Sequence, residues 1–201
     1  MTGELERLRR RYQDHAPGLL GASRSYAVLC PLIEGEDGLR FLFEVRSSQV
    51  SQGGEVCFPG GRMEPGETPQ ACALRETEEE LSIPREEVTL LGTPDFICNQ
   101  RGFLLRPVLG LVSQAGLAAL RPSPAEVAEV FTVPLAFFRE TPPDLRRYEL
   151  VPQVPEDFPY GPVGVPRDYP WSRGQVEIPI WYYQSHVVWG MTARLVREIV
   201  R

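Results

Sequence analysis

Lysine is absent from this chain of 201 residues, and all 21 of its basic residues are arginine. A lysine Schiff base is therefore excluded, and so is a phosphate-binding loop of the G-x-x-x-x-G-K-[ST] type. Any phosphate group must instead be held by arginine side chains or by backbone amides.

Cysteine and histidine are scarce, with four and two residues. The cysteines are Cys30, Cys57, Cys72 and Cys98. Because they form no C-x-x-C pair and only two histidines could join them, the sequence does not indicate a zinc site. We expect free thiols in a reducing compartment.

Long apolar runs are also missing. No stretch approaches the roughly 18 apolar residues of a membrane-spanning helix, and residues 1–16 lack the apolar region of a signal peptide. We therefore expect a cytoplasmic protein without a membrane partner. A net charge of −6 argues against nucleic acid as a partner. The hydrophobic content of 42% suffices for the core of a single domain spanning 1–201.

The hydrophobic pattern predicts strands mixed with helices. Residues 24–46 are expected to form a hairpin turning at "EGEDG", with Leu39, Phe41, Phe43 and Val45 on one face of its second strand. Further strands are expected at 87–97, 103–112, 128–135 and 176–183. Helices are expected at 3–14, within a surface segment 1–16, at 134–140, and after Ser185 as a cap. This mixture indicates an α/β fold with helices packed on a mixed sheet.

Residues 152–174 differ from the rest because they are rich in proline, glycine and aromatic residues and show no period. A loop of this length inside a compact domain is usually functional or disordered. A substrate-side lid, an interface arm and a solvated insertion all stay open for this segment.

One more helix is expected between residues 69 and 82. Thr68 can accept hydrogen bonds as its N-cap, Pro69 suits its first position, and Pro84 stops it. The helix therefore has well-marked ends, and its position fixes which of its side chains share a face.

Three carboxylates crowd one side of this helix. At about 100° per residue, Glu76, Glu79 and Glu80 fall within one arc, in the half where the helix dipole disfavours negative charge by roughly 0.3–1 kcal/mol per group. An isolated cluster of this kind is most often a solvated helix face. Here, however, the loop before the helix supplies Gly61 and Glu67. Such a set of oxygen ligands suits a hard divalent cation such as Mg²⁺.

The spacing of these residues resembles the signature of the Nudix hydrolases, G-x5-E-x7-R-E-U-x-E-E-x-G-U, in which U is a bulky aliphatic residue. The matching residues are Gly61, Glu67, Arg75, Glu76, Glu79, Glu80 and Ile83. The chain departs from the signature at Thr77, in place of an aliphatic residue, and at Ser82, in place of glycine. Neither departure removes a metal ligand.

The resemblance implies an α/β/α sandwich that hydrolyses a nucleoside diphosphate linked to another group, with Mg²⁺ or Mn²⁺ as cofactor. Glu76 and Glu80 would be the main metal ligands, with Glu79 close by. Glu67 and the backbone of Gly61 would contribute further, and Arg75 would orient the glutamates. The general base stays open between a glutamate of the signature, such as Glu79 or Glu80, and the later Glu126 or Glu129.

A second resemblance concerns the substrate. Residues 42–61 are similar to the motif L-L-T-x-R-S-x3-R-x3-G-x3-F-P-G-G of the coenzyme A pyrophosphatase branch. Arg46 and Ser47 match this motif and would bind substrate, whereas its second arginine is absent. Arg62 or Arg101 would replace that arginine.

The resemblance thus implies hydrolysis of coenzyme A, or its derivatives, to 3′,5′-ADP and 4′-phosphopantetheine. ADP-ribose, a dinucleotide or an oxidised nucleotide as substrate stays an alternative. A catalytically silent nucleotide-binding module is a third reading, and a homodimer through the N-terminal helix or residues 152–174 also stays open.

Overall fold

The expected hairpin of residues 24–46 lies at the centre of the molecule. In the computed structural model, which describes residues 3–15, 18–21, 24–100 and 102–201, β1 (Arg24–Gly35) and β2 (Gly38–Arg46) pair antiparallel. The turn between them is closed by Arg40, whose Nη1 donates to Asp37 Oδ2 at 2.8 Å. The predicted turn at "EGEDG" is therefore confirmed.

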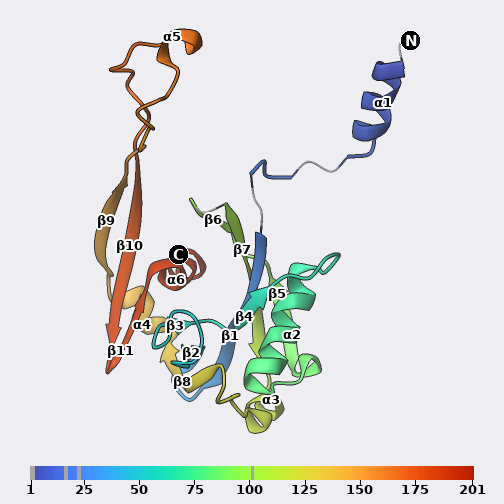
Figure 1. Ribbon diagram of the computed structural model, residues 1–201. Coiled ribbons are helices and arrows are strands. Elements are labelled where there is room, and N and C mark those ends of the chain that lie inside the picture. The colour runs from blue at the N-terminus through green and yellow to red at the C-terminus, as the bar shows by residue number, and fades with distance from the viewer. Residues whose placement is uncertain (1–2, 16–17, 22–23, 101) are drawn as a thin grey trace.

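The main sheet grows outward from this hairpin (Figure 1). Its strand order is β3 (Val56–Cys57), β2, β1, β7 (Phe103–Val112), β5 (Val88–Gly92). Off this path, β4 (Gly60–Arg62) pairs with β1, β6 (Ile97–Cys98) with β7, and β8 (Val127–Pro134) with β2. Because β1 and β7 run parallel while β1 and β2 run antiparallel, the sheet is mixed, as the sequence predicts.

Helices cover both faces of this sheet, with α2 (Pro69–Leu81) on one side and α6 (Gly190–Val200) on the other (Figure 1). Successive residues of β2 point to opposite faces. Phe41 and Phe43 pack in the cluster that contains α6, whereas Leu42 packs in the cluster that contains α2. The α/β/α sandwich is confirmed, and β2 is buried on both faces.

Three short helical segments complete the sandwich and lie near its strand ends. They are a 3₁₀ turn at Arg85–Glu87, α3 (Gln114–Ala119) and α4 (Leu135–Glu140). The helix expected at 134–140 is thereby confirmed.

Helix α2 begins and ends close to where its sequence signals predict. Thr68 Oγ1 accepts a hydrogen bond from Ala71 N at 3.1 Å, and Pro69 is the first helical residue. The helix ends at Leu81, and Ser82 follows with φ 57° and ψ 23°, in the left-handed region that favours glycine. Serine therefore takes the glycine conformation of the signature.

Thr77, the other departure from the signature, is fully buried on the face of α2 that packs against the sheet. Its Oγ1 donates to Ala73 O, one turn earlier, at 2.7 Å. The hydroxyl is thus satisfied within the helix, so a threonine can occupy a position where an aliphatic residue is expected.

A second, three-stranded sheet forms an arm that extends away from the sandwich (Figure 1). It consists of β9 (Asp144–Leu150), β10 (Gly174–Tyr183) and β11 (His186–Trp189). Residues 152–174 connect β9 to β10 at the far end of the arm and include the short helix α5 (Tyr160–Val163). In this segment Phe158 packs edge-on against Trp171, with 5.3 Å between the ring centroids.

The sequence analysis was wrong about the start of the last helix. Ser185 does not cap it: Gln184 and Ser185 form a tight turn, and residues 186–189 pair with β10 as strand β11. The β-branched Val187 and Val188 favour this extended conformation. The helix α6 begins only at Gly190.

Helix α1 (Gly3–Tyr12) buries none of its residues and stands apart from the sheets in Figure 1, as a surface helix should. Within the described part of the chain, no helix is both long and apolar enough to cross a membrane. The single-domain organisation of 1–201 stays a prediction.

The left-handed residue at the end of α2 gives a stability prediction. Ser82→Gly should raise the free energy of unfolding by about 0.5–1 kcal/mol, because glycine adopts this conformation without a steric cost. Ser82→Ala should lower it by about 1 kcal/mol, because alanine keeps the strain and loses the 3.0 Å bond from Ser82 Oγ to Arg121 O. Urea denaturation of both variants measures this order, and a glycine variant less stable than the alanine variant would contradict it.

Candidate active site

Two glycines bring the backbone of β4 against both β1 and α2. Gly60 and Gly61 pair with Val28 and Ala27 of β1. A Cβ on Gly60 would lie 2.3 Å from Ala27 O, and a Cβ on Gly61 would lie 2.3 Å from the carboxylate of Glu76. A Cβ would collide with the backbone at Gly60 and would displace the Glu76 side chain at Gly61. This glycine pair at the start of β4, called the glycine turn below, therefore places backbone atoms directly beside a carboxylate of the helix.

Glu80 lies beneath this turn and is only 4% exposed. Its Oε2 accepts a hydrogen bond from Gly60 N at 2.8 Å. Burial, and then the negative charge of Glu44, raise the pKa of Glu80, while the Gly60 amide opposes this rise. A buried carboxylate with other carboxylates around it favours the binding of a positive charge.

Arg75 connects the outer carboxylates of the motif. Its guanidinium donates to Glu67 Oε1 at 3.0 Å, to Glu76 Oε1 at 2.9 Å and to Glu79 Oε2 at 3.3 Å. The hydrogen bonds from Arg75 to Glu67, and then the one from the backbone amide of Glu64, lower the pKa of Glu67 to about 2. The arrangement lets one arginine position three glutamates, and the Glu79 side chain remains 58% exposed.

Burial disfavours the ionised form of Glu76 as it does that of Glu80. Burial raises the pKa of Glu76 despite Arg75, and the charges of Glu79 and Glu126 raise it further. Among the described residues, no three acidic, cysteine or histidine side chains converge closely enough to hold a metal, and Arg75 engages Glu67, Glu76 and Glu79.

The donor set nevertheless fits a hard divalent cation. Carboxylate oxygens of Glu76 and Glu80 lie beside the backbone of the glycine turn, where a side chain on Gly61 would collide with Glu76. Oxygen donors with concentrated negative charge are the ligands that Mg²⁺ and Mn²⁺ prefer.

The two later candidates for the general base occupy different surroundings. Glu126 lies near the motif, because its amide donates to Ser123 O at 3.0 Å and the Ser123 amide donates to Glu80 O at 2.8 Å. Its charge accordingly acts on both Glu76 and Glu80. Glu129 instead pairs with His186, with 3.0 Å between Oε1 and Nε2, and lines a separate cavity at the base of the arm. The ring of His186 stacks on that of Phe131, with 3.7 Å between the ring centroids. Glu126 is therefore the candidate that lies near the carboxylates of the motif, whereas Glu129 lies at a separate cavity.

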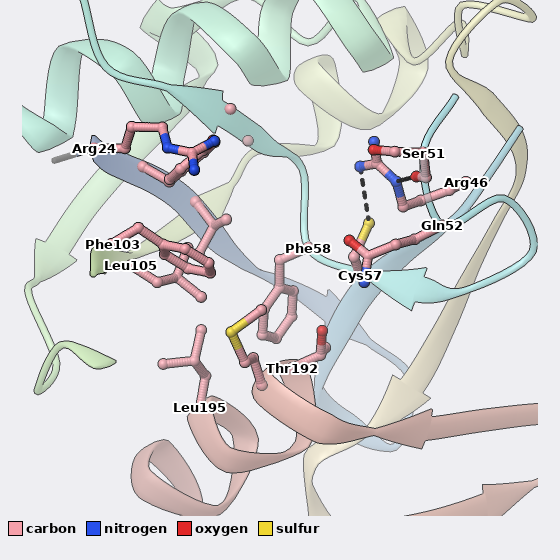
Figure 2. Close-up of a pocket in the computed structure, with 15 residues that line it drawn as sticks. Arg24, Arg46, Ser51, Gln52, Cys57, Phe58, Phe103, Leu105, Thr192 and Leu195 are labelled. Atoms are coloured by element: carbon pink, nitrogen blue, oxygen red, sulfur yellow. Dashed lines mark hydrogen bonds between the residues drawn. The ribbon is translucent and has the colours of Figure 1, made fainter. Parts of the chain in front are cut away.

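A cavity of about 350 Å³ opens beside the glycine turn (Figure 2). Figure 2 shows Arg24 on one side of it and Arg46 on the other, with Phe103, Leu105 and Leu195 forming an apolar wall. The cavity therefore offers two cationic ends and an apolar middle next to the carboxylates.

The predicted substrate-binding residues are not all at this cavity. Arg46 lines it, donating from Nε to Ser51 O at 2.9 Å. Ser47 is buried in the following turn, where its amide donates to Glu126 O at 2.7 Å. Arg62 lines a neighbouring cavity that it shares with Arg24. Arg101 lies outside the described residues.

Two residues at the site were missed by sequence reasoning. Arg24 lines both cavities, and its only signal is its position at the start of the central strand. Glu44 is buried in β2, and its signal is a charged residue inside an otherwise apolar strand run.

Comparisons with known proteins agree with this geometry. The sequence profile of the NUDIX domain matches residues 23–154. The chain belongs to the Nudix hydrolase family. Like the Nudix hydrolases it resembles, it is a pyrophosphohydrolase, and metal use is general among these enzymes.

Two curated Nudix proteins show how far the likeness extends. A Nudix hydrolase named NudL from Photorhabdus laumondii is 32% identical over 181 residues, which is 89% of this chain and 84% of NudL. The peroxisomal coenzyme A diphosphatase NUDT7 of Mus musculus is 34% identical over 139 residues, 68% of this chain and 57% of NUDT7. Among solved structures, the Nudix hydrolase RenU from M. smegmatis aligns with a TM-score of 0.49 and 22% identity, over 58% of this chain and 73% of RenU.

The close approach of Gly61 to Glu76 gives a catalytic prediction. Gly61→Ala should lower diphosphate hydrolysis at least about 100-fold, because the new methyl group displaces the Glu76 carboxylate by ångströms. The free energy of unfolding should change by less than about 1 kcal/mol, since the displaced atoms end a flexible side chain.

Gly161→Ala is the control, because nothing lies within 4 Å of a Cβ at that position in the arm. Steady-state kinetics and urea denaturation measure both properties. A Gly61→Ala enzyme with near wild-type turnover would show that the Nudix glycine turn does not position Glu76.

Proposed function

We propose that this Nudix enzyme is a Mg²⁺- or Mn²⁺-dependent coenzyme A diphosphatase. The observation that carries the proposal is the cavity beside Gly60 and Gly61, whose arginine ends flank an apolar wall. Coenzyme A has the same order of chemistry, with phosphates on its nucleotide half and an uncharged, partly apolar pantetheine arm. The likeness to the mouse coenzyme A diphosphatase supports the same substrate.

In this proposal the residues divide the work of diphosphate hydrolysis. A water attacks one phosphorus atom, the bridging phosphorus–oxygen bond breaks, and 3′,5′-ADP and 4′-phosphopantetheine leave. Glu76 and Glu80 would hold a divalent ion, which would neutralise phosphate charge and lower the pKa of the attacking water. Arg75 positions the glutamates, and Glu126 or a glutamate of the motif accepts the proton of the water.

The substrate itself is held by the walls of the cavity. Arg46 and Arg24 bind phosphate oxygens through charge-assisted hydrogen bonds. Phe103, Leu105 and Leu195 take the pantetheine arm and exclude water from it. Ser47 contributes through the backbone hydrogen bond that its amide donates to Glu126 O rather than through contact with substrate.

A second candidate substrate is another Nudix substrate, such as ADP-ribose, a dinucleotide or an oxidised nucleotide. One observation favours it: the second arginine of the coenzyme A motif is absent, with Val50 or Ser51 nearest to its position, and the Ser51 carbonyl accepts a hydrogen bond from Arg46. The catalytically silent reading is less well supported, because every acidic residue of the signature is present.

Location and assembly belong to the same proposal. The four cysteines are free thiols, which supports a reducing compartment such as the cytoplasm.

A homodimer through the arm is supported by the exposed apolar side chains along it, among them Leu145, Tyr148 and Tyr182.

Replacing a buried ligand tests the metal dependence. Wild-type protein should hydrolyse coenzyme A only with Mg²⁺ or Mn²⁺ present, and Glu80→Gln should reduce turnover at least about 100-fold, because it removes the charge that binds the ion. Glu78→Gln is the matched control: Glu78 lies on the same helix but pairs outward with Arg85 at 2.6 Å. Chromatography of the products measures the rate, and equal rates for the two variants would reject the proposed ligand set.

The substrate itself is tested by comparing coenzyme A with dephospho-coenzyme A, which lacks the 3′-phosphate. Arg46→Ala should lower kcat/KM for coenzyme A about 10- to 100-fold, the cost of one charge-assisted contact, and should affect dephospho-coenzyme A less. Arg85→Ala, on the surface, is the control. Faster wild-type turnover of ADP-ribose or a dinucleotide than of coenzyme A would favour the second candidate.

A further inference from the structure

A buried carboxylate in the main sheet is left without a full set of partners. Glu44 lies on β2 and is only 1% exposed. Its Oε1 accepts a hydrogen bond from Cys57 Sγ at 3.2 Å. Its Oε2 is buried and has no hydrogen-bond partner within the described part of the chain. Such a group is costly to bury unless another ligand completes its surroundings.

The pleat of β2 shows which way Glu44 points. Side chains two residues apart on a strand share a face. Leu42 packs in the cluster of α2, and Val130, the cross-strand partner of Glu44 on β8, packs against the same cluster. Glu44 therefore lies on the face of the sheet covered by α2, the helix that carries Glu76 and Glu80.

Charge effects agree with this placement. The negative charge of Glu44 acts on Glu80, and Glu126 acts on both of them. The positive charge of Arg46 acts on Glu44 and on Glu80, and its guanidinium lies 3.9 Å from Cys57 Sγ. The acidic cluster thus includes one carboxylate supplied by the sheet.

Cys57 links Glu44 to the cavity. It lies opposite Glu44 in the pairing of β2 with β3, and it lines the cavity together with Gly60 and Gly61. The amide of Gly60 holds Glu80. Glu44, through its Oε1, and Glu80, through its Oε2, are therefore hydrogen-bonded to the two ends of one short segment, residues 57–60, which leaves Oε2 of Glu44 free among the described residues.

We propose that Glu44 is a further acidic member of the metal site, binding the divalent ion or one of its water ligands from the sheet side. The inference rests on the proposed function, because it concerns the same ion. Glu44 stands where the coenzyme A motif has threonine, so this chain adds a negative charge to the usual set. A site with an extra carboxylate binds a divalent cation more tightly.

A purely structural Glu44 would behave differently on substitution. If its only role were the bond from Cys57, replacing it would destabilise the protein and leave metal affinity unchanged. If it serves the ion, removing its charge weakens metal binding while the metal-free protein becomes more stable or stays as stable, because like-charge repulsion with Glu80 is relieved.

The experiment measures Mn²⁺ binding directly, without turnover. Full-length protein is stripped of metal and titrated with Mn²⁺ by isothermal titration calorimetry and by electron paramagnetic resonance. Glu44→Gln keeps the shape without the charge, and Glu44→Thr restores the residue of the motif. Glu80→Gln removes a proposed metal ligand and shows how far Mn²⁺ affinity falls when the main site is lost. Glu78→Gln is the control, because Glu78 pairs with Arg85 and its loss should leave Mn²⁺ affinity unchanged.

We expect both Glu44 variants to bind Mn²⁺ at least tenfold more weakly than wild type, with metal-free melting temperatures no lower than wild type. Wild-type Mn²⁺ affinity in Glu44→Gln, or in Glu44→Thr should the first variant not fold, would overturn this inference alone, provided that Glu80→Gln binds weakly. Failure of the wild-type protein to bind Mn²⁺ would overturn the proposed metal site and this inference together.

Discussion

Unneutralised negative charge between helix α2 and the sheet is the constraint on which the rest of the site depends. Glu44 and Glu80 are almost fully buried, and Glu76 is largely so. Arg75 compensates the charges on the outer side, where it holds Glu67, Glu76 and Glu79. On the inner side, Arg46 acts on Glu44 and Glu80 through its charge, while its hydrogen bonds go to Ser51 and Cys57. In the proposed function, this arrangement sacrifices stability for an affinity toward a divalent ion, and functional sites commonly carry such a cost.

The sandwich keeps this charge in place through two rigid parts. Helix α2 has well-defined ends, and its apolar side packs on a strand pair that is buried on both faces. The glycine turn approaches so closely that its backbone contacts both β1 and Glu76. A misplacement of either part would separate the carboxylates from the cavity proposed to hold the substrate.

Local signals explain what the sequence could predict. The ends of α2, the hairpin of β1 and β2, and the spacing from Gly61 to Glu80 depend on neighbouring residues, and each was found. Strand β9 was missed because it is mostly exposed and carries no apolar alternation. The start of α6 was misplaced because the apolar residues at helical spacing extend upstream to Val188, which lies in strand β11. The proposed role of Glu44, and the different surroundings of Glu126 and Glu129, depend on where the tertiary structure places each side chain. Local sequence signals do not determine that placement.

The most direct test of this account is to locate the ion. Crystals grown with Mn²⁺ and a non-cleavable coenzyme A analogue would be measured at a wavelength where manganese scatters anomalously. The account predicts an anomalous peak between Glu76 and Glu80, beside the backbone of Gly61. An empty map at that position, at a saturating Mn²⁺ concentration, would contradict it.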